Sequence, residues 1–576
     1  MDERKRANGS RVTRRVVLSG ASAAAVAIAL AACGGAAPTP TPTPASAAKS
    51  GTNAATPNVT GAGGTVPPAM GSASGTTAPS PGGSTPMPAS GMSGGTPKKG
   101  GILKMTQPLP IVPFEFHQLT LAPLMFMLGV FDTIVRYDAA LKPQPRLAES
   151  WAWNATNTEL TLRLRKGVKY HTGRDFTSDD VKFNIERVRD MKLASQLRGN
   201  SLTIKEITTP DASTAVLKFD QPNLAIFDML DLMVMLDKET AADLEGAKQV
   251  IGTGAFKWKE YAPGSKLTLV RNDQYWETGK PYLDGIDLQI TDDKQSMVTG
   301  VESGQRDVGW QVLAQDLNRL KGNPNVTPII SDKGAQFYYL GANATGDVVK
   351  DKRIRQAVNY AIDRKRIADT LLFGLAEPTA LPWPKFSPAA NAEIDKSVSF
   401  DLERSKKLFA DAGFAPGSSL TIEVGTQDPL NQKIAQVVQS DLAKINIKMD
   451  VQPYDTTTFQ KKLNEAGFMQ VFGNTIGFSN LSPVTFFLTA YPVRVSGNAA
   501  KFQSPDYSDL VTKMQVETDP AKLKLLYDRM NKLIVDESFN MIVCTAPQGW
   551  VTYKAVKNWT YNTFNMVQLE SVWLDR

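Results

Sequence analysis

Side chains that commonly carry catalytic or metal chemistry are scarce in this sequence of 576 residues. It contains two cysteines, Cys33 and Cys544, and two histidines, His117 and His171. A zinc site usually needs a cluster of Cys and His side chains, and a Ser-His-Asp triad needs a histidine beside its nucleophile. The spacing offers neither arrangement. We therefore expect no bound metal, no cofactor and no enzymatic activity, and we expect His171 to be a structural or surface residue.

Cys33 is the residue whose surroundings predict a covalent modification. A basic segment that includes Arg14 and Arg15 precedes an apolar run, and that run ends in Leu30-Ala31-Ala32-Cys33. The run is short for a membrane-spanning helix, which needs about 20 apolar residues, and it is typical of a signal-peptide core. The Arg14-Arg15 pair resembles a twin-arginine export signal, with the Sec route as the alternative.

The end of the apolar run resembles a bacterial lipobox, in which the cysteine is acylated and becomes the new N-terminus. We therefore predict a signal peptide with a lipobox over residues 1–33 and a lipid anchor on Cys33. The alternative is a signal that is simply discarded together with Cys33. The second cysteine, Cys544, lies in the run Met541-Ile542-Val543-Cys544-Thr545, which is typical of a buried strand. We expect its thiol to be part of a hydrophobic core.

Residues 34–99 have a composition that cannot form a folded core. They are mostly Pro, Thr, Ala, Gly and Ser, and they include no acidic residue. Ordering such a segment would cost conformational entropy with little apolar burial to offset it. We expect a disordered linker that tethers a folded body to the membrane.

The net charge of +7 belongs to the export signal and the linker. Residues 1–33 contribute +4 and residues 34–99 contribute +3, which leaves residues 100–576 with a net charge of zero. A nucleic-acid-binding domain usually carries a basic surface. We therefore expect no nucleic-acid partner.

Hydrophobic periodicity predicts the elements that would position a site. Residues 160–165 alternate apolar and polar side chains, as a half-buried strand does, and residues 266–270 indicate a second strand. Thr177 or Ser178 can cap a helix that begins with two acidic residues. A helical stripe follows over residues 351–373.

A second helical stripe, over residues 434–445, leads directly into an alternating strand at residues 447–451. Helix followed by strand, repeated along a chain, favours α/β layers. We find no short-period internal repeat. About 475 residues follow the linker, which is enough for two or three domains.

Three groups of short motifs follow one another in residues 100–576. They are Pro145–Trp151 with Leu162–His171 and Phe176–Val181, then Gly252–Phe256 with Arg271–Trp276 and Gly279–Asp284, and finally Asp351–Arg364. Their order and spacing are similar to those of the bacterial extracellular solute-binding proteins of family 5, the dipeptide, oligopeptide and nickel group. The resemblance covers nearly all of residues 100–576.

This resemblance implies a two-lobed α/β fold like that of the periplasmic binding proteins of type II, cluster C. Three interleaved domains would leave a cleft between the lobes. Residues 100–130, 251–330 and 546–576 would form domain I in lobe 1, residues 131–250 would form an inserted domain II, and residues 331–545 would form domain III, which is lobe 2. Gly252-Thr253-Gly254 lacks the rest of a phosphate-binding loop, and we expect it to be a tight connection.

The resemblance also implies where a solute would contact the protein. In peptide-binding relatives an Asp of the third domain pairs with the ammonium group of the ligand. The matching stretch here includes Gly477, Phe478, Ser479 and Asn480, with Ser479 or Asn480 at the position of the Asp and no acidic residue nearby. A hydroxyl or an amide bonds an ammonium group more weakly than a carboxylate does, so the identity of the solute stays open.

Further candidate ligand contacts lie near the predicted entrance to lobe 2. Gln336, Phe337, Tyr338 and Tyr339 follow one another there, and Trp310 and Trp383 are expected to supply flat apolar walls. For each aromatic residue, packing in the core is the alternative.

The family resemblance implies a receptor that captures a solute outside the membrane for an ABC importer. The partners would be a peptide or similar small solute, a permease with its ATPase, and the membrane through Cys33. We expect a monomer on the outer face of the cytoplasmic membrane or in the periplasm. The alternatives are a receptor for a non-peptide solute such as an oligosaccharide, a chaperone or sensor of the same fold, and an anchored hydrolase.

Overall fold

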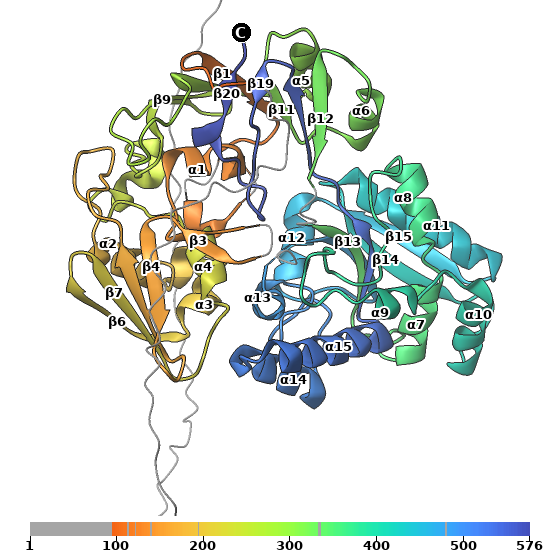
Figure 1. Ribbon diagram of the computed structural model, residues 1–576. Helices are drawn as coiled ribbons and strands as arrows, with labels where there is room; N and C mark the ends of the chain where they lie inside the picture. The colour runs from red at the N-terminus through yellow and green to blue at the C-terminus, as the bar shows by residue number, and fades with distance from the viewer. Residues whose placement is uncertain are drawn as a thin grey trace, which may run out of the picture. The chain divides into compact units, whose positions relative to one another are not determined.

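Three larger β-sheets organise the part of the chain that the structure describes (Figure 1). The computed structural model describes residues 95–111, 115–120, 122–138, 141–193, 195–331, 336–477 and 481–576. The predictions for residues 1–33, which include Arg14, Arg15 and Cys33, lie outside the described residues. So do those for residues 34–94 of the linker and for Phe478, Ser479 and Asn480.

A seven-stranded sheet collects strands from distant parts of the sequence. In spatial order they are β12 (Val326–Ile330), β18 (Gly549–Tyr553), β11 (Val308–Trp310), β1 (Ile102–Gln107), β10 (Gly285–Ile290), β9 (Lys266–Arg271) and β8 (Phe256–Ala262). The central strand β1 pairs in parallel with β10 along its whole length and with β11 near its end. Helices α5 (Lys294–Glu302) and α6 (Ala314–Arg319) pack against this sheet. The strand predicted at residues 266–270 is confirmed as β9.

The two places where the chain passes between the seven-stranded sheet and the next one lie side by side. The chain leaves after β12 and returns into β18, and these two strands are paired antiparallel. Beyond the last pair, Ser331 N donates to Gln548 O at 2.8 Å, and Ala546 N donates to Gln336 O at 2.8 Å. The passages therefore form a double connection.

A four-stranded antiparallel sheet is built from residues 148–219. Its order is β4 (Ala148–Trp153), β5 (Glu159–Leu164), β7 (Thr214–Phe219) and β6 (Ile204–Asp211). Its helices are α2 (Ser178–Arg187), α3 (Arg198–Ser201) and α4 (Ile226–Leu232). Both predictions for this region are confirmed: the alternating strand is β5, and Thr177 caps α2 in a capping box with Asp180.

A five-stranded sheet lies between two layers of helices. Its order is β15 (Lys448–Tyr454), β14 (Ser419–Gly425), β16 (Val471–Ile476), β13 (Phe337–Ala342) and β17 (Asn540–Thr545). The side chains of β13 alternate, so Tyr338 and Leu340 pack in one core and Phe337 and Tyr339 in the other. The first core is covered by α7 (Lys352–Tyr360), α8 (Arg364–Leu371), α10 (Leu402–Asp411) and α11 (Pro429–Lys444). The second is covered by α12 (Thr456–Asn464), α13 (Pro483–Thr489), α14 (Pro505–Val516) and α15 (Pro520–Glu537).

The helical stripe predicted over residues 351–373 is divided between α7 and α8. Asp363 lies outside both helices, and its carboxylate accepts a hydrogen bond from Arg366 N. A side chain that caps the second helix in this way competes with continuation of the first. The helix predicted over residues 434–445 is confirmed as the second part of α11, which ends at Lys444, and the strand that follows it is β15.

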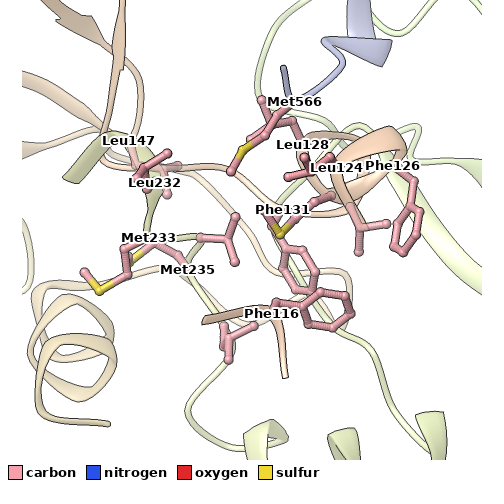
Figure 2. Close-up of a cluster of buried hydrophobic side chains, with 14 of the residues drawn as sticks. Phe116, Leu124, Phe126, Leu128, Phe131, Leu147, Leu232, Met233, Met235 and Met566 are labelled. Carbon is pink, nitrogen blue, oxygen red and sulfur yellow. The ribbon is translucent and has the colours of Figure 1, made fainter. Parts of the chain in front are cut away.

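Apolar side chains join the seven-stranded sheet to the segments around the four-stranded sheet. Figure 2 shows part of this core, in which Phe116, Phe131, Leu232, Met235 and Met566 come from segments far apart in the sequence. Each of these five side chains is at most 1 % exposed. The two sheets therefore share one hydrophobic core.

A buried ionic cluster accounts for several of the motif residues. Arg146 donates to Asp132 Oδ1 at 2.7 Å and to Tyr275 Oη at 2.9 Å, and it also bonds Glu277. Trp276 Nε1 donates to Asp132 Oδ2 at 3.0 Å. Burial alone would raise the pKa of Glu277, but Arg146 and Lys280 lower it to about 2. These residues are therefore architectural.

The two histidines are also parts of the framework. His171 Nε2 lies 3.0 Å from Gly254 O, and its Nδ1 accepts from Gly252 N at 3.3 Å. His117 Nε2 lies 2.9 Å from Val234 O. Burial lowers the pKa of each histidine to about 4. Both rings are therefore neutral near pH 7.

Candidate functional site

A cavity of about 870 Å³ lies beside the double connection between the seven-stranded and five-stranded sheets. Its walls come from the connection itself, from the start of β13, from the segment between α8 and α10, and from Asn565. The lining residues are Ile330, Ser331, Phe337, Leu375, Glu377, Pro378, Thr379, Leu381, Trp383, Pro384, Lys385, Phe386, Ala390, Asn391, Ala392, Asp395, Lys396, Thr545, Ala546, Pro547, Gln548 and Asn565. A cavity of this size is in the range of small-molecule sites.

Trp383 gives the cavity a rigid aromatic wall. Its Nε1 donates to Asn531 Oδ1 at 2.7 Å. Its ring packs edge-on against Phe486 and Phe487, at centroid distances of 5.1 and 5.7 Å. The side chain is 6 % exposed. Because the hydrogen bond and the two rings fix its orientation, Trp383 can offer an apolar surface without losing rotamer entropy on binding.

The charged groups of the cavity wall compensate one another. Asp395 Oδ1 accepts from Thr379 Oγ1 at 2.7 Å, from Ala380 N at 2.7 Å and from Leu381 N at 3.1 Å. Glu377 pairs with Lys385 at 2.6 Å. Lys396 is the fourth charged residue of the lining, so the wall has no net charge. An apolar or uncharged group of a ligand suits this wall better than an isolated ion.

Polar side chains also brace the double connection where it borders the cavity. Ser331 Oγ donates to Asn565 Oδ1 at 2.6 Å, and Asn565 Nδ2 donates to Gln548 Oε1 at 2.9 Å. The two passages and the C-terminal segment are thereby linked. Sequence reasoning missed this brace, because the three residues are isolated polar positions without a motif.

The structure brings some of the predicted ligand contacts together and separates others. Phe337 and Trp383 both line the cavity. Gln336 lies at the double connection, where its backbone oxygen is bonded to Ala546 N. Gly477, half-buried, directly follows β16. Phe478, Ser479 and Asn480 lie outside the described residues.

Tyr338 and Trp310 point into other parts of the structure. Tyr338 faces the opposite core from Phe337, and its hydroxyl donates to Asp428 Oδ2 at 2.9 Å. Trp310 is fully buried in the seven-stranded sheet, where it is paired with Trp550. The segment between α8 and α10, which supplies most of the lining, was missed apart from Trp383. Its sequence signal is Leu381-Pro382-Trp383-Pro384, in which two prolines hold a large aromatic residue in an extended segment.

Cys544 lies in β17 as predicted, and it is fully buried. Burial raises the pKa of its thiol to about 12, whereas Arg364 acts in the opposite direction. Reactive cysteines have low pKa values and some exposure. The thiol is therefore a poor nucleophile in this environment.

Among the residues that the structure describes, no group of three or more His, Cys, Asp or Glu side chains could hold a metal ion. Within the same residues, no helix combines the length and the apolar character that a membrane crossing requires.

A family described as "Bacterial extracellular solute-binding proteins, family 5 Middle" matches residues 142–498. Heme-binding protein A of Haemophilus influenzae is 24% identical over 433 residues, which is 69% of this chain and 77% of that protein. The dipeptide-binding protein of Escherichia coli is 24% identical over 461 residues, covering 74% of this chain and 85% of that protein.

Solved structures are also similar to this chain. One is the ABC transporter-associated periplasmic binding protein DppA from Helicobacter pylori in complex with peptide STSA. It has a TM-score of 0.72 and 22% identity, and the match covers 83% of this chain and 99% of DppA. This likeness shows the fold, and it confirms the predicted two-lobed α/β architecture of periplasmic binding proteins.

Proposed function

We propose a function in solute capture from the premise that the chain belongs to the bacterial extracellular solute-binding proteins of family 5, whose match spans more than half of the sequence. Members of this family are exported binding proteins rather than enzymes. The observation that carries the proposal is the cavity of about 870 Å³ beside the double connection. There a bound solute would contact residues on both sides of the double connection.

The mechanism we propose is closure of two lobes around the solute. The seven-stranded and four-stranded sheets would form one lobe and the five-stranded sheet the other, with the double connection as the hinge. A solute that contacts both lobes binds the closed form better than the open form and shifts the population toward it. No covalent step is required, because micromolar affinity corresponds to only about 8 kcal/mol.

The solute class that suits this site is a peptide or a similar small solute held without a strong charge pair. The wall of the cavity has no net charge. Residues 475–487 include no acidic side chain, so this stretch itself, unlike that of some relatives, supplies no carboxylate for a free ammonium group. Two similar proteins are named for heme and for dipeptides. A non-peptide solute is therefore the second candidate.

Replacing Trp383 with leucine is expected to weaken solute binding by about tenfold or more, or about 1.4 kcal/mol. The substitution removes the aromatic wall and its bond to Asn531. The solute that co-purifies with the protein would be identified by mass spectrometry and titrated back by calorimetry. Trp153→Leu, in the four-stranded sheet and outside the cavity wall, is the matched control. Equal affinity of both variants, with intact folding, would place the solute elsewhere.

We further propose that Cys33 carries a lipid anchor, that Arg14 and Arg15 form part of a Tat signal, and that residues 34–99 tether the receptor near a permease with its ATPase. A tether raises the effective concentration of the receptor at that partner. The protein would act as a monomer on the outer face of the cytoplasmic membrane.

Cys33→Ser is expected to move the protein from the membrane fraction to the soluble fraction. The cause would be the loss of the only acylated thiol, and incorporation of a labelled fatty acid measures it directly. Cys544→Ala, which alters the buried core thiol, is the control and should keep the label. Label retained by Cys33→Ser would contradict the anchor. Turnover of ester, peptide or glycoside substrates by the purified protein would instead support the anchored hydrolase.

A further inference from the structure

Asp228 is a buried carboxylate on α4 whose hydrogen bonds reach two different parts of the structure. Asp228 is only 1 % exposed. On the near side, which is the part of the structure that contains α4, Tyr137 Oη donates to Asp228 Oδ1 at 2.8 Å. On the far side, Ser482 N donates to Asp228 Oδ2 at 3.2 Å, and Thr485 Oγ1 also donates to Oδ2.

The two sides of this contact belong to different sheets. Tyr137 and Asp228 belong to the segments around the four-stranded sheet, whereas Ser482 and Thr485 lie at the start of α13, beside the five-stranded sheet. Ala225, one turn before Asp228, packs against the core of the five-stranded sheet. Asp228 is therefore at the centre of a contact that the double connection does not supply.

This contact also lies close in sequence to the predicted ligand-binding stretch. Ser482 follows residues 477–480, the stretch that the family resemblance assigns to the solute, by two positions. The bond from Ser482 N ties the start of α13 to Asp228, and Asp228 itself lies outside the lining of the solute cavity.

The other titratable and charged groups near Asp228 come from three elements. Asp231 lies one turn further along α4, Arg136 and Tyr137 lie on β2 (Val135–Tyr137), and Tyr527 lies on α15. Arg136 is bonded to Glu570 at 2.7 Å. Burial raises the pKa of Asp228 to about 6, and the bonds from Thr485, Tyr137 and Ser482 act in the opposite direction.

We propose that Asp228 is a positioning residue that latches the two lobes together over the solute and makes the closure sensitive to acid. This proposal rests on the proposed hinge closure. When the lobes part, Asp228 loses Ser482 and Thr485 and gains water, and when they close it is desolvated again. The latch thus acts on the solute through the positions of the two lobes.

The direction of the acid effect follows from linkage. In the open form a hydrated Asp228 would titrate near the ordinary value of about 4, whereas in the latched form its pKa is about 6. The latched form therefore takes up a proton as the pH falls, and acid favours it. The advantage is lost as the pH rises through about 6. Between pH 7 and pH 5 the closing equilibrium is expected to shift about tenfold toward the closed form.

The test measures the distance between two spin labels without any solute. Labels would be placed by Glu186→Cys on α2 and Lys522→Cys on α15, both exposed positions, in the full chain with Cys33→Ser. The buried Cys544 stays unlabelled. In this parent the closed population should rise between pH 7 and pH 5, whereas in Asp228→Asn it should be the same at both values.

Asp231→Asn is the matched control. Asp231 is equally buried on the same helix, and burial raises its pKa to about 7, but its bond is to Tyr137 N on the near side. Parting of the lobes leaves that bond intact, so this variant should keep the response of the label distance to acid. Thr485→Val is a milder change that removes one hydrogen-bond donor to the ionised Asp228. Because that bond lowers the pKa of Asp228, the closed population should then rise more strongly between pH 7 and pH 5.

The outcomes separate the latch from the proposed function. A parent without a pH response, or an Asp228→Asn variant with the same response as the parent, overturns the latch. If a tryptic digest of casein still shortens the label distance in that case, solute capture stands without the latch. A pH response that disappears only in Asp228→Asn supports the latch. If the casein peptides leave the label distance unchanged in the same experiment, the result contradicts peptide capture but not the latch.

Discussion

Replacing Arg146 with methionine is expected to lower the free energy of unfolding by about 3–5 kcal/mol, the usual effect of leaving a buried ion pair with one partner. Arg146 bonds Asp132, which is fully buried, and Glu277, and it lies 4.0 Å from Glu570. Methionine fills a similar volume but leaves the buried Asp132 without the cation that pairs with it, whereas Glu277 keeps Lys280 and Glu570 keeps Arg136. Denaturant unfolding of the full chain, with and without the substitution, measures the difference.

Arg271→Met is the control for this prediction. Arg271 also belongs to a motif block and also pairs with two carboxylates, Asp273 and Asp284, but its side chain is 35% exposed. Exposed pairs contribute about 0–1 kcal/mol. Equal losses of stability in the two variants would mean that the Arg146 cluster is no more important than a surface pair. Arg146→Lys, which keeps the charge but loses the fork geometry, should fall between the two.

Replacing Gly254 with alanine is expected to destabilise the protein by about 3 kcal/mol, at the upper end of the range for overpacked sites. A Cβ at this position would lie 2.6 Å from the backbone oxygens of both Gly129 and Val130. Both oxygens are backbone atoms, so neither can rotate away as a side chain would. The hydrogen bond from Gly254 N to Val130 O at 3.0 Å also holds the two segments close together. The substitution therefore forces two backbone segments apart.

The same change would disturb a second set of contacts, since Gly254 O accepts from Asn272 Nδ2 and lies 3.0 Å from His171 Nε2. Thermal unfolding of Gly254→Ala and of Gly199→Ala would be compared. No atom lies within 4 Å of a Cβ at Gly199, which is in the short helix α3, so that variant should be nearly unchanged. A Gly254→Ala protein as stable as Gly199→Ala would contradict the steric explanation.

Local features of this fold could be predicted from the sequence because their causes are local. The capping box of α2 depends on Thr177 and Asp180, which are three residues apart. The alternation of β5 reflects the burial of one face of a sheet. The division between α7 and α8 also has a local cause, the cap at Asp363. Because the apolar stripe continues through this position, periodicity alone could not predict where one helix ends and the next begins.

The candidate site could be predicted only in part because its walls meet through long-range packing. The aromatic run that begins at Phe337 was recognised, but periodicity does not show which face of β13 borders a cavity, so Tyr338 was grouped with Phe337. The brace between Ser331 and Asn565 joins residues 234 positions apart. Asp228 and Thr485 are 257 positions apart. No spacing rule links such pairs in a single sequence.

If the proposed lipid anchor holds the protein by its N-terminal end, the position of β1 has a mechanical consequence. The strand starts at Ile102, only a few residues from the linker, and it lies between β10 and β11 in the middle of the seven-stranded sheet. Tension from the linker would pull β1 along its own axis, parallel to β10 and β11. The backbone hydrogen bonds to both neighbouring strands would then resist together instead of breaking one after another. The lobe built on the five-stranded sheet would carry none of that force. It would remain free to rotate while tension acts on the other lobe.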